Sequence, residues 1–302
     1  MITVVVCTYD RPELLAACLA SLTRDPSAPP AWELLLVDNG GREGTREVAA
    51  RFAERLPLRF LREERVGKSF ALNRALAEAR GELLLFADDD VEVQPGWMGA
   101  FVAAANRAPE AGWFGGRSLP RWGPGAPRWV ENDLPSALHG YVCRYDLGPE
   151  PRPYGDGDLA PIGACMAVRA DTFAATGGYD PGFGPRGSDR DIGDDTELIR
   201  RAREHLIPGF WVPAATVDHF VPASRLRVRT VVGYGIVKGR QQAMMDKAPR
   251  RFARGMTRAS GQILRGAAQW LRRRYGNAAV CALNVGLALG GDVLSRSRQG
   301  EP

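Results

Sequence analysis

The clearest indication of the fold is GELLLFADDD, residues 81–90, in which an apolar run passes directly into three aspartates. Leu83–Ala87 has the length and hydrophobicity of a buried strand. Asp88, Asp89 and Asp90 follow at its carboxyl end. Because open α/β sheets bind ligands outside the carboxyl ends of their strands, these aspartates are predicted to face a ligand.

The sequence before this run alternates strand-like and helix-like segments. Further strands are predicted at Ile2–Cys7, Leu34–Val37 and Leu58–Leu61. Helices are predicted between them, at Pro12–Leu22, Gly44–Leu56 and Ser69–Ala79. This alternation predicts an α/β fold with a Rossmann-like, mostly parallel sheet flanked by helices.

The sequence after residue 111 is less regular. Residues 112–162 are rich in Gly, Pro, Trp and Arg, which predicts long loops and short strands of the kind that often carry specificity. An apolar run at Ala164–Val168 follows, then a predicted helix at Thr196–His205 and a predicted strand near Phe210–Val212.

Charge divides the chain into two parts. The composition, 45% hydrophobic and 25% charged, is that of a globular protein and excludes a disordered or fibrous chain. Residues 226–302 hold 15 Lys and Arg against three acids, whereas residues 1–225 hold 25 against 32. We therefore expect a catalytic domain over 1–225 and a basic, helical C-terminal region over 226–302.

The basic region has two open interpretations. Arg272–Arg274, beside Trp270 on an amphipathic pattern, suits an anionic membrane surface. The same residues suit a solvated face that packs on the catalytic domain or on a second copy in a homo-oligomer. No nucleic-acid partner is expected, since no other feature of the sequence supports one.

Cysteine content and hydropathy indicate location. The five cysteines are an odd number without CxxC spacing, which predicts free thiols, and Cys7 and Cys18 fall in apolar patterns. The N-terminus lacks the features of a secretion signal, and no apolar run reaches the roughly 20 residues of a membrane-spanning helix. We expect a cytoplasmic protein, with peripheral attachment to the inner face of the plasma membrane as a hypothesis.

Three adjacent carboxylates repel one another unless a cation or hydrogen bonds compensate them. A divalent ion bound by one or two carboxylates together with substrate phosphates is the usual solution. Asp88–Asp90 are therefore predicted to hold a metal and a nucleotide, although aspartates are also common in loops after strands. His219, in the sequence VDHF, is either a structural histidine or a further metal ligand.

A second acidic cluster comprises Asp189, Asp191, Asp194, Asp195 and Glu197. Asp194 and Glu197 have the spacing of a capping box, which leaves Asp195 at the helix start as a candidate general base. Lys68, before a predicted helix, favours a phosphate. The absence of GxxxxGK[ST], GxGxxG, GxSxG and HExxH argues against P-loop proteins, dinucleotide oxidoreductases, serine hydrolases and zinc proteases.

Together these segments resemble a family 2 glycosyltransferase of the GT-A fold, from about Ile2 to Arg240. VVVCTYDRP (4–12), LVDNG (36–40) and GKSFALN (67–73) resemble the opening strand, the V-D-D-G stretch and the G-K-x-x-A-L-N helix start of that family. FADDD (86–90), GGYD (177–180) and GDDTEL (193–198) resemble its D-x-D, G-G-F-D and G-E-D-x-E-L segments.

The resemblance implies a role for each matching residue. Asp38 would hold the nucleotide base with Tyr9 packed beside it, and Asp195 would be the catalytic base. Asp90 would bind Mn²⁺ or Mg²⁺, with Asp88 and His219 as further ligands. The remaining expected donor contacts are Thr8, Asp10, Arg11, Lys68, Asn73, Asp88 and Asp89. Many relatives carry Arg at the position of Leu72, so Lys68, Arg65 or Arg74 would supply that charge.

The resemblance also implies an activity. It is metal-dependent, inverting transfer of a sugar from a nucleoside-diphosphate sugar, commonly a UDP-sugar, to an acceptor hydroxyl. A sugar or lipid-linked acceptor is expected, for polysaccharide, glycolipid or cell-envelope glycan synthesis, with residues 112–162 selecting it. Two alternatives stay open: a nucleotidyltransferase acting on sugar phosphates, and a non-catalytic scaffold that binds nucleotide sugars.

Overall fold

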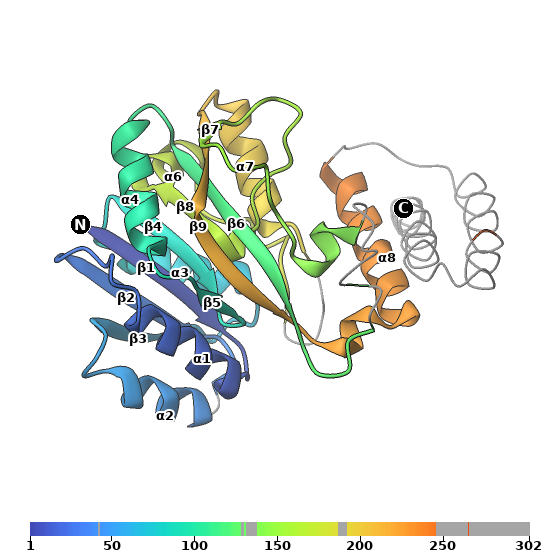
Figure 1. The fold of residues 1–302 in the computed structure, drawn as a ribbon, viewed down its shortest axis with the longest axis horizontal. Coiled ribbons are helices and arrows are strands. Elements are labelled where there is room, and N and C mark those ends of the chain that lie inside the picture. The colour runs from blue at the N-terminus through green and yellow to red at the C-terminus, as the bar shows by residue number, and fades with distance from the viewer. Residues whose placement is uncertain (42, 128–129, 131–137, 187–191, 246–264, 266–302) are drawn as a thin grey trace, which may run out of the picture. The chain divides into compact units, whose positions relative to one another are not determined.

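The computed structural model describes residues 1–302 except 42, 128–129, 131–137, 187–191, 246–264 and 266–302 (Figure 1). The chain forms two compact units. The first comprises Met1–Pro120, Tyr145–Asp189 and Asp194–Phe220, and the second Arg121–Arg144, Arg190–Gly193 and Val221–Pro302. Among the described residues, no helix combines the length and the apolar character that crossing a membrane requires.

The N-terminal half of the sheet is parallel. Its strands are β1 (Ile2–Thr8), β2 (Trp32–Asp38), β3 (Leu58–Arg62) and β4 (Leu83–Asp88). They alternate with the helices α1 (Pro12–Thr23), α2 (Glu43–Phe52) and α3 (Lys68–Glu78). β1 pairs in parallel with both β2 and β4, and β2 pairs in parallel with β3. The predicted α/β fold class is therefore confirmed.

The remaining strands extend this sheet in the order β3-β2-β1-β4-β8-β6-β9-β5, with β7 beside β9. They are β5 (Val91–Val93), β6 (Trp113–Trp122), β7 (Arg152–Pro153), β8 (Met166–Arg169) and β9 (Gly209–Val221). β8 runs antiparallel to β4, and β5 antiparallel to β9. The later helices are α4 (Trp97–Arg107), α6 (Ala170–Thr176) and α7 (Asp194–Glu204).

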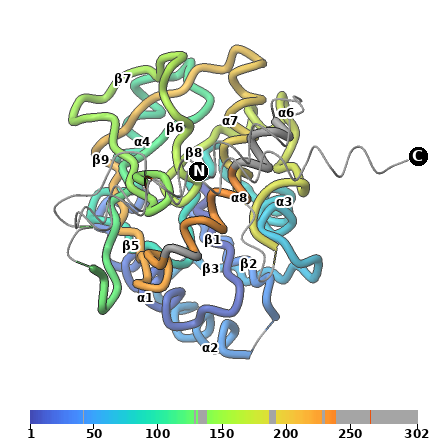
Figure 2. The backbone as a smooth tube through the Cα atoms, turned by 90° about the vertical axis from the view of Figure 1, so that its right-hand side faces the viewer, coloured from blue at the N-terminus to red at the C-terminus, as the bar shows by residue number. Residues whose placement is uncertain are grey.

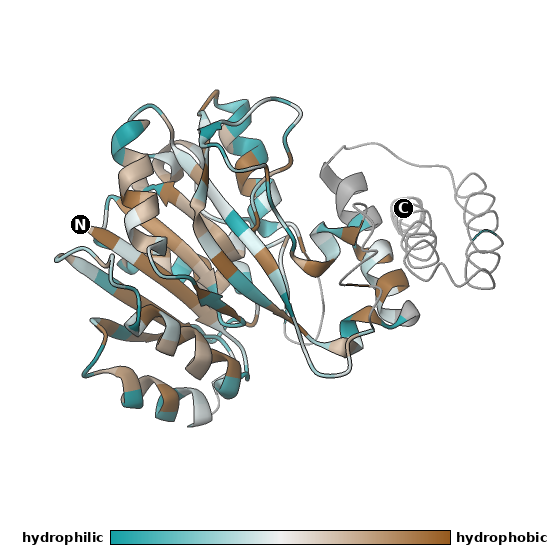
Figure 3. Ribbon diagram, viewed as in Figure 1, coloured by the Kyte–Doolittle hydropathy of each residue, from teal (hydrophilic) through white to brown (hydrophobic). Residues whose placement is uncertain are grey.

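Helices cover both faces of the sheet. On one face α1, α2 and α4 pack with Val4, Leu36 and Leu85, and on the other α3 and α7 pack with Val5, Leu35 and Leu84. Figure 2 shows α1 and α4 on one side of the strands and α3, α6 and α7 on the other. The apolar strands between them are brown in Figure 3, as expected for a parallel sheet that is buried on both faces.

The second unit has an apolar cluster of its own, which includes Tyr141, Val142, Val221 and Val231. The ring of Tyr141 lies 4.6 Å from that of Tyr234 on α8 (Val228–Met245). The helical character predicted for residues 226–302 is present in α8. Arg272–Arg274 lie outside the described residues, so the membrane and assembly interpretations stay predictions, as does the division at residue 225.

Candidate active site

Three neighbouring parallel strands deliver polar residues to one edge of the sheet. In the register of the sheet, Thr8 at the end of β1 lies beside Asp38 at the end of β2, and Cys7 lies beside Asp88 at the end of β4. The apolar residues before them are buried, so the chain direction alone carries these polar groups to the carboxyl edge. The polar residues predicted to face a ligand therefore lie together at one edge of the sheet.

Asp88, Asp90 and His219 form a cluster with the character of a metal site. One donor atom from each of the three lies within 4.8 Å of the others. The Nε2 atom of His219 is 3.5 Å from Oδ1 of Asp90. β5 pairs with β9 so that Val91 lies opposite His219, which places the histidine beside Asp90 although it lies far from it in the sequence.

The middle aspartate is oriented differently. Asp89 is fully buried, its Oδ2 accepts a hydrogen bond of 2.7 Å from the Thr8 hydroxyl, and its Oδ1 lies 2.7 Å from Nη2 of Arg11. Burial raises the pKa of Asp89, and the nearby Arg11 guanidinium opposes that rise. Thr8 and Arg11 thus both contact Asp89, and the donor contacts predicted for these three residues stay predictions.

Lys68 stands at the first residue of α3. Its Nζ atom lies 2.6 Å from Oδ1 of Asp88. Burial alone would lower the pKa of Lys68, but the carboxylates of Asp88 and Asp194 raise it well above its ordinary value. The lysine therefore stays charged. Of the three basic residues expected to replace the arginine missing at Leu72, only Lys68 lines the pocket described below, whereas Arg65 pairs with Glu63 and Arg74 with Glu78.

Two asparagine side chains tie α3 to neighbouring loops. Asn39 donates to the carbonyls of Glu63 and Arg65 and accepts from the N–H of Gly67. Asn73 both donates to the carbonyl of Tyr179 and accepts from its N–H, each at 2.8 Å. The geometry gives Asn73 a positioning task, and the donor contact expected of it stays a prediction.

Asp195 lies near the N-terminus of α7. Its Oδ2 atom accepts a hydrogen bond of 2.7 Å from the N–H of Gly163, and its Oδ1 accepts one of 2.6 Å from the N–H of Thr196. Gly163 begins a short 3₁₀ helix before β8. No sequence motif marked Gly163, because it contributes only a backbone group that any residue except proline offers.

The capping interaction expected for Glu197 is wrong. α7 begins at Asp194, so Asp194 is the first helical residue and not its cap. The buried Glu197 carboxylate binds Arg201 instead, through contacts of 2.8 to 2.9 Å. Arg201 also donates to the carbonyl of Gly178, which ties α7 to the turn that Asn73 holds. Asp189 and Asp191 lie outside the described residues.

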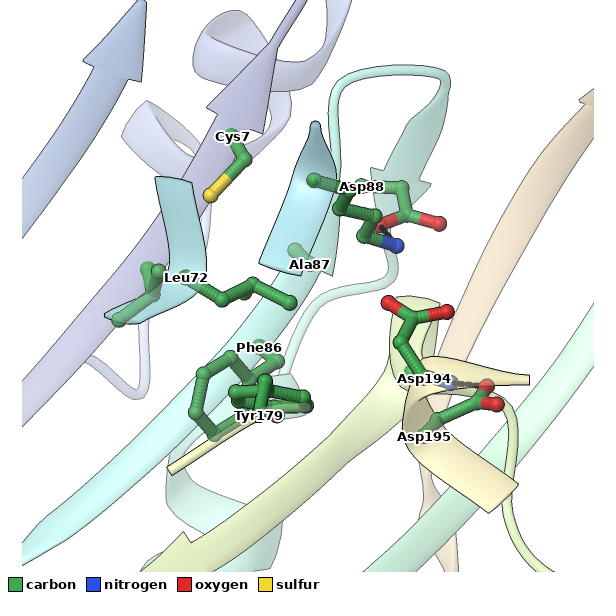
Figure 4. Close-up of a pocket in the computed structure, with 11 residues that line it drawn as sticks. Cys7, Leu72, Phe86, Ala87, Asp88, Tyr179, Asp194 and Asp195 are labelled. Atoms are coloured by element: carbon green, nitrogen blue, oxygen red, sulfur yellow. Dashed lines mark hydrogen bonds and ion pairs between the residues drawn. The ribbon is translucent and has the colours of Figure 1, made fainter. Parts of the chain in front are cut away.

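One pocket joins the two acidic groups. Its lining includes Lys68, Asp88, Gly163, Asp194 and Asp195. Figure 4 shows the carboxylates of Asp88, Asp194 and Asp195 together, opposite apolar side chains of Leu72, Phe86 and Tyr179. Burial raises the pKa of Asp194 to about 6, and Lys68 opposes this shift. Cys7, a free thiol, also lines the pocket.

The expected base-binding residues lie at the adjoining loops. Asp38 is buried, and its Oδ1 accepts hydrogen bonds from the N–H groups of Gly40 and Gly41. A Cβ atom at Gly40 would lie 2.7 Å from Oδ1 of Asp10, so the close approach of the two loops requires glycine there. Tyr9 lies between Thr8 and Asp10 on the first of these loops. The contacts predicted for Tyr9, Asp10 and Asp38 stay predictions.

Several known proteins are similar to this chain in sequence. The chain is 30% identical over 227 residues to the N-acetylglucosaminyl-diphospho-decaprenol L-rhamnosyltransferase of Mycobacterium tuberculosis, covering 64% of this chain and 69% of that protein. It is 28% identical over 198 residues to O-antigen biosynthesis protein RfbC of Myxococcus xanthus. This match covers 64% of this chain but only 16% of that much longer protein.

A solved structure has the same fold. The mannosyltransferase PcManGT from Pyrobaculum calidifontis, in complex with GDP-Man and Mn²⁺, superimposes with a TM-score of 0.63 at 18% identity, covering 95% of this chain and 86% of that one. The sequence model of glycosyl transferase family 2 matches residues 3–173, more than half of the chain. The matched residues contain the β1, β2 and β4 edge with Asp38, Asp88 and Asp90, and on this evidence the chain belongs to glycosyl transferase family 2.

Proposed function

We propose that the protein is a metal-dependent, inverting glycosyltransferase that moves a sugar from a nucleoside-diphosphate sugar to an acceptor hydroxyl. One observation carries the proposal: one pocket is lined both by Asp88, a member of the candidate metal cluster Asp88–Asp90–His219, and by Asp195. Glycosyl transfer needs both tasks, stabilisation of a leaving diphosphate and activation of a hydroxyl, within the length of one sugar.

The donor atoms of Asp88, Asp90 and His219 fit a divalent cation. Two carboxylates with one imidazole suit a divalent ion such as Mn²⁺. When bound, such an ion neutralises charge on the leaving diphosphate. Lys68 adds a permanent positive charge beside Asp88, so this side of the pocket is built to hold phosphate oxygens.

Asp195, which lines the same pocket, is suited to proton abstraction. Asp195 is held by N–H groups at both of its oxygens, which orients the carboxylate before any substrate arrives. The acceptor hydroxyl would lose its proton to Asp195 as it attacks the anomeric carbon. A base on the face opposite the leaving group gives a single in-line displacement, and hence inversion.

The donor nucleotide and the acceptor are proposed by analogy. Relatives include a rhamnosyltransferase that acts on a diphospho-decaprenol lipid, and solved neighbours are complexes with GDP-Man and with UDP-GlcNAc. A UDP-sugar donor and a sugar or lipid-linked acceptor follow from the same analogy. Peripheral membrane attachment through the basic region would suit a lipid-linked acceptor. Membership of the family favours glycosyl transfer over the nucleotidyltransferase and scaffold alternatives.

The test is a thermal-shift experiment with UDP, GDP and their sugar conjugates, with Mn²⁺ or EDTA. A ligand that binds the folded state at 100 times its Kd stabilises by about 2.7 kcal/mol, so the donors rank by affinity. Asp90→Asn should lose the Mn²⁺-dependent shift, whereas Glu92→Gln, which removes an acid two residues away that pairs with Arg24, should keep it. A native protein whose melting temperature responds to no nucleotide would overturn the proposal.

A further inference from the structure

Arg11 contacts two of the three consecutive aspartates at once. Its Nη2 atom lies 2.7 Å from Oδ1 of Asp89, and its Nη1 atom 2.8 Å from Oδ2 of Asp90. The planar guanidinium group has the fork geometry that such a double contact requires, whereas a lysine ammonium is a single point charge. Arg11 therefore holds the two carboxylates in a fixed relation to each other.

Asp89 in turn holds Arg11. Its carboxylate is fully buried and accepts from the Thr8 hydroxyl through the oxygen that does not face Arg11. Both of its oxygens are thus engaged by protein groups, one by Thr8 at the end of β1 and one by Arg11 in the loop that follows. A buried carboxylate held in this way fixes the position of the Arg11 guanidinium.

Asp90 uses its two oxygens differently. Oδ2 faces Arg11, and Oδ1 lies 3.5 Å from Nε2 of His219. The contact with Arg11 therefore selects the side-chain rotation that directs Oδ1 toward the histidine and the shared donor cluster. From this geometry we propose that Arg11, anchored by Asp89, is a positioning residue that presents Asp90 to the divalent cation. The inference rests on the proposed function, since it concerns the metal of that reaction.

The proposed role of Arg11 and simple electrostatics predict opposite changes in Mn²⁺ affinity. A guanidinium close to a cation site repels the cation, so removing its charge should strengthen metal binding. If Arg11 instead sets the rotamer of Asp90 and screens it from the adjacent Asp89, removing it leaves two neighbouring carboxylates without their common partner, and metal binding weakens. The direction of the change in Mn²⁺ affinity separates these two cases.

The experiment measures Mn²⁺ binding to the whole chain without nucleotide, by the loss of the electron paramagnetic resonance signal of free Mn²⁺. We expect Arg11→Met to weaken binding about tenfold or more, about 1.4 kcal/mol per factor of ten. Arg11→Lys should also weaken it, because one ammonium cannot bridge both carboxylates. The matched control is Arg24→Met, which removes a positive charge that pairs with Glu92 and with neither Asp89 nor Asp90, and should not weaken binding.

Asp89→Asn provides an independent variant, because it removes the anchor and keeps the arginine charge. It should weaken Mn²⁺ binding as well. The double variant Arg11→Met, Asp89→Asn should bind Mn²⁺ no more weakly than Arg11→Met alone. Circular dichroism and melting curves in EDTA check that each variant is folded. If Arg11→Met does not fold, Arg11→Lys and Asp89→Asn decide the question.

Failure of this inference and failure of the proposed function would give different results. Unchanged or tighter Mn²⁺ binding by folded Arg11→Met, Arg11→Lys and Asp89→Asn would overturn this inference and leave the proposed function intact. Loss of nucleotide binding in EDTA with normal Mn²⁺ binding would also overturn it, and would make Arg11 a donor contact. A native chain that binds no Mn²⁺, or an Asp90→Asn variant that binds it normally, would instead refute the metal site of the proposed function.

Discussion

The N–H of Gly163 donates a hydrogen bond of 2.7 Å to Oδ2 of Asp195, and this contact joins the 3₁₀ turn before β8 to the first turn of α7. The two residues are far apart in sequence, yet both line the pocket that also contains Asp88. A backbone donor cannot rotate away as a side chain can. The candidate base therefore has a defined orientation relative to the edge of the sheet that carries Asp88 and Asp90.

Removing this donor should impair catalysis more than folding. Gly163 is the first residue of its 3₁₀ helix and follows an extended Ile162, a position that accepts proline. Gly163→Pro deletes the N–H and should lower kcat by about ten- to a hundredfold, the worth of a hydrogen bond to a charged group. Gly163→Ala keeps the N–H and is the control. Equal kcat values for the two variants would show that the contact does not matter.

Removing the Asp195 carboxylate should lower kcat more than removing its Gly163 donor does. Asp195→Asn keeps the size of the side chain but cannot take a proton, so kcat should fall by about 10²- to 10⁴-fold while the donor Kd stays unchanged. Single-turnover kinetics with the best donor from the thermal-shift screen, together with donor titrations, give both quantities. Near-native turnover would remove Asp195 from the role of base.

Asp194 should make stability depend on pH. Its pKa in the folded chain is raised to about 6, above about 3.9 for an exposed aspartate. The folded state therefore holds this proton more tightly, and its contribution to stability is complete below pH about 4 and is lost as the pH rises through about 6.

Asp194→Asn lacks this titration. In EDTA, its melting temperature relative to the native chain should rise as the pH increases from about 4 to 7. Asp156→Asn, at an exposed position, is the control and should show a flat difference. A flat difference for Asp194→Asn as well would mean that Asp194 ionises in the folded chain as it does in water.

Two arginines contact Glu197 but should differ in their effect on stability. Arg201 is largely buried and bridges Glu197 to the carbonyl of Gly178, whereas Arg200 is 39% exposed and makes only helical contacts on α7. Arg201→Ala leaves a buried carboxylate poorly compensated and should lower the free energy of unfolding by about 3 kcal/mol or more. Arg200→Ala should change it by less than about 1 kcal/mol. Similar denaturant midpoints for both variants would contradict this assignment.

The N-terminal half of the fold could be predicted because its strands are buried on both faces and separated by helices. Ile2–Cys7 and Leu83–Ala87 are such runs, and β1 and β4 match them within one residue. α4 was not predicted, although its buried residues Trp97, Met98, Phe101, Ala104 and Ala105 recur at the spacing of one helical face.

The C-terminal strands were harder to predict because they contain residues typical of turns. β9 runs from Gly209 to Val221 and continues through Pro213, although the sequence indicated only a short strand near Phe210–Val212. β6 contains Gly116, where a Cβ atom would lie 2.4 Å from the carbonyl oxygen of Ala215, so close strand approach requires this glycine. Sequence patterns cannot separate that requirement from a turn.

The candidate site, like the fold, could be predicted from the sequence only in part. The aspartates at the end of β4 follow a buried run, so their position could be predicted. The position of His219 beside them could not, because it depends on the pairing of β9 with β5. No sequence pattern indicated the Gly163–Asp195 contact or the Asn73–Tyr179 contact, because each depends on a backbone group of a segment distant in sequence.

The central claim is tested most directly by the stereochemistry of donor hydrolysis, in which water replaces the unidentified acceptor. Proton NMR would follow the native chain with Mn²⁺ and UDP-GlcNAc, UDP-glucose or GDP-mannose. We predict that the first sugar released has the anomeric configuration opposite to that in the donor, and that EDTA or Asp195→Asn suppresses its release. Release with the donor's own configuration, or at an equal rate in EDTA, would contradict a metal-dependent inverting mechanism.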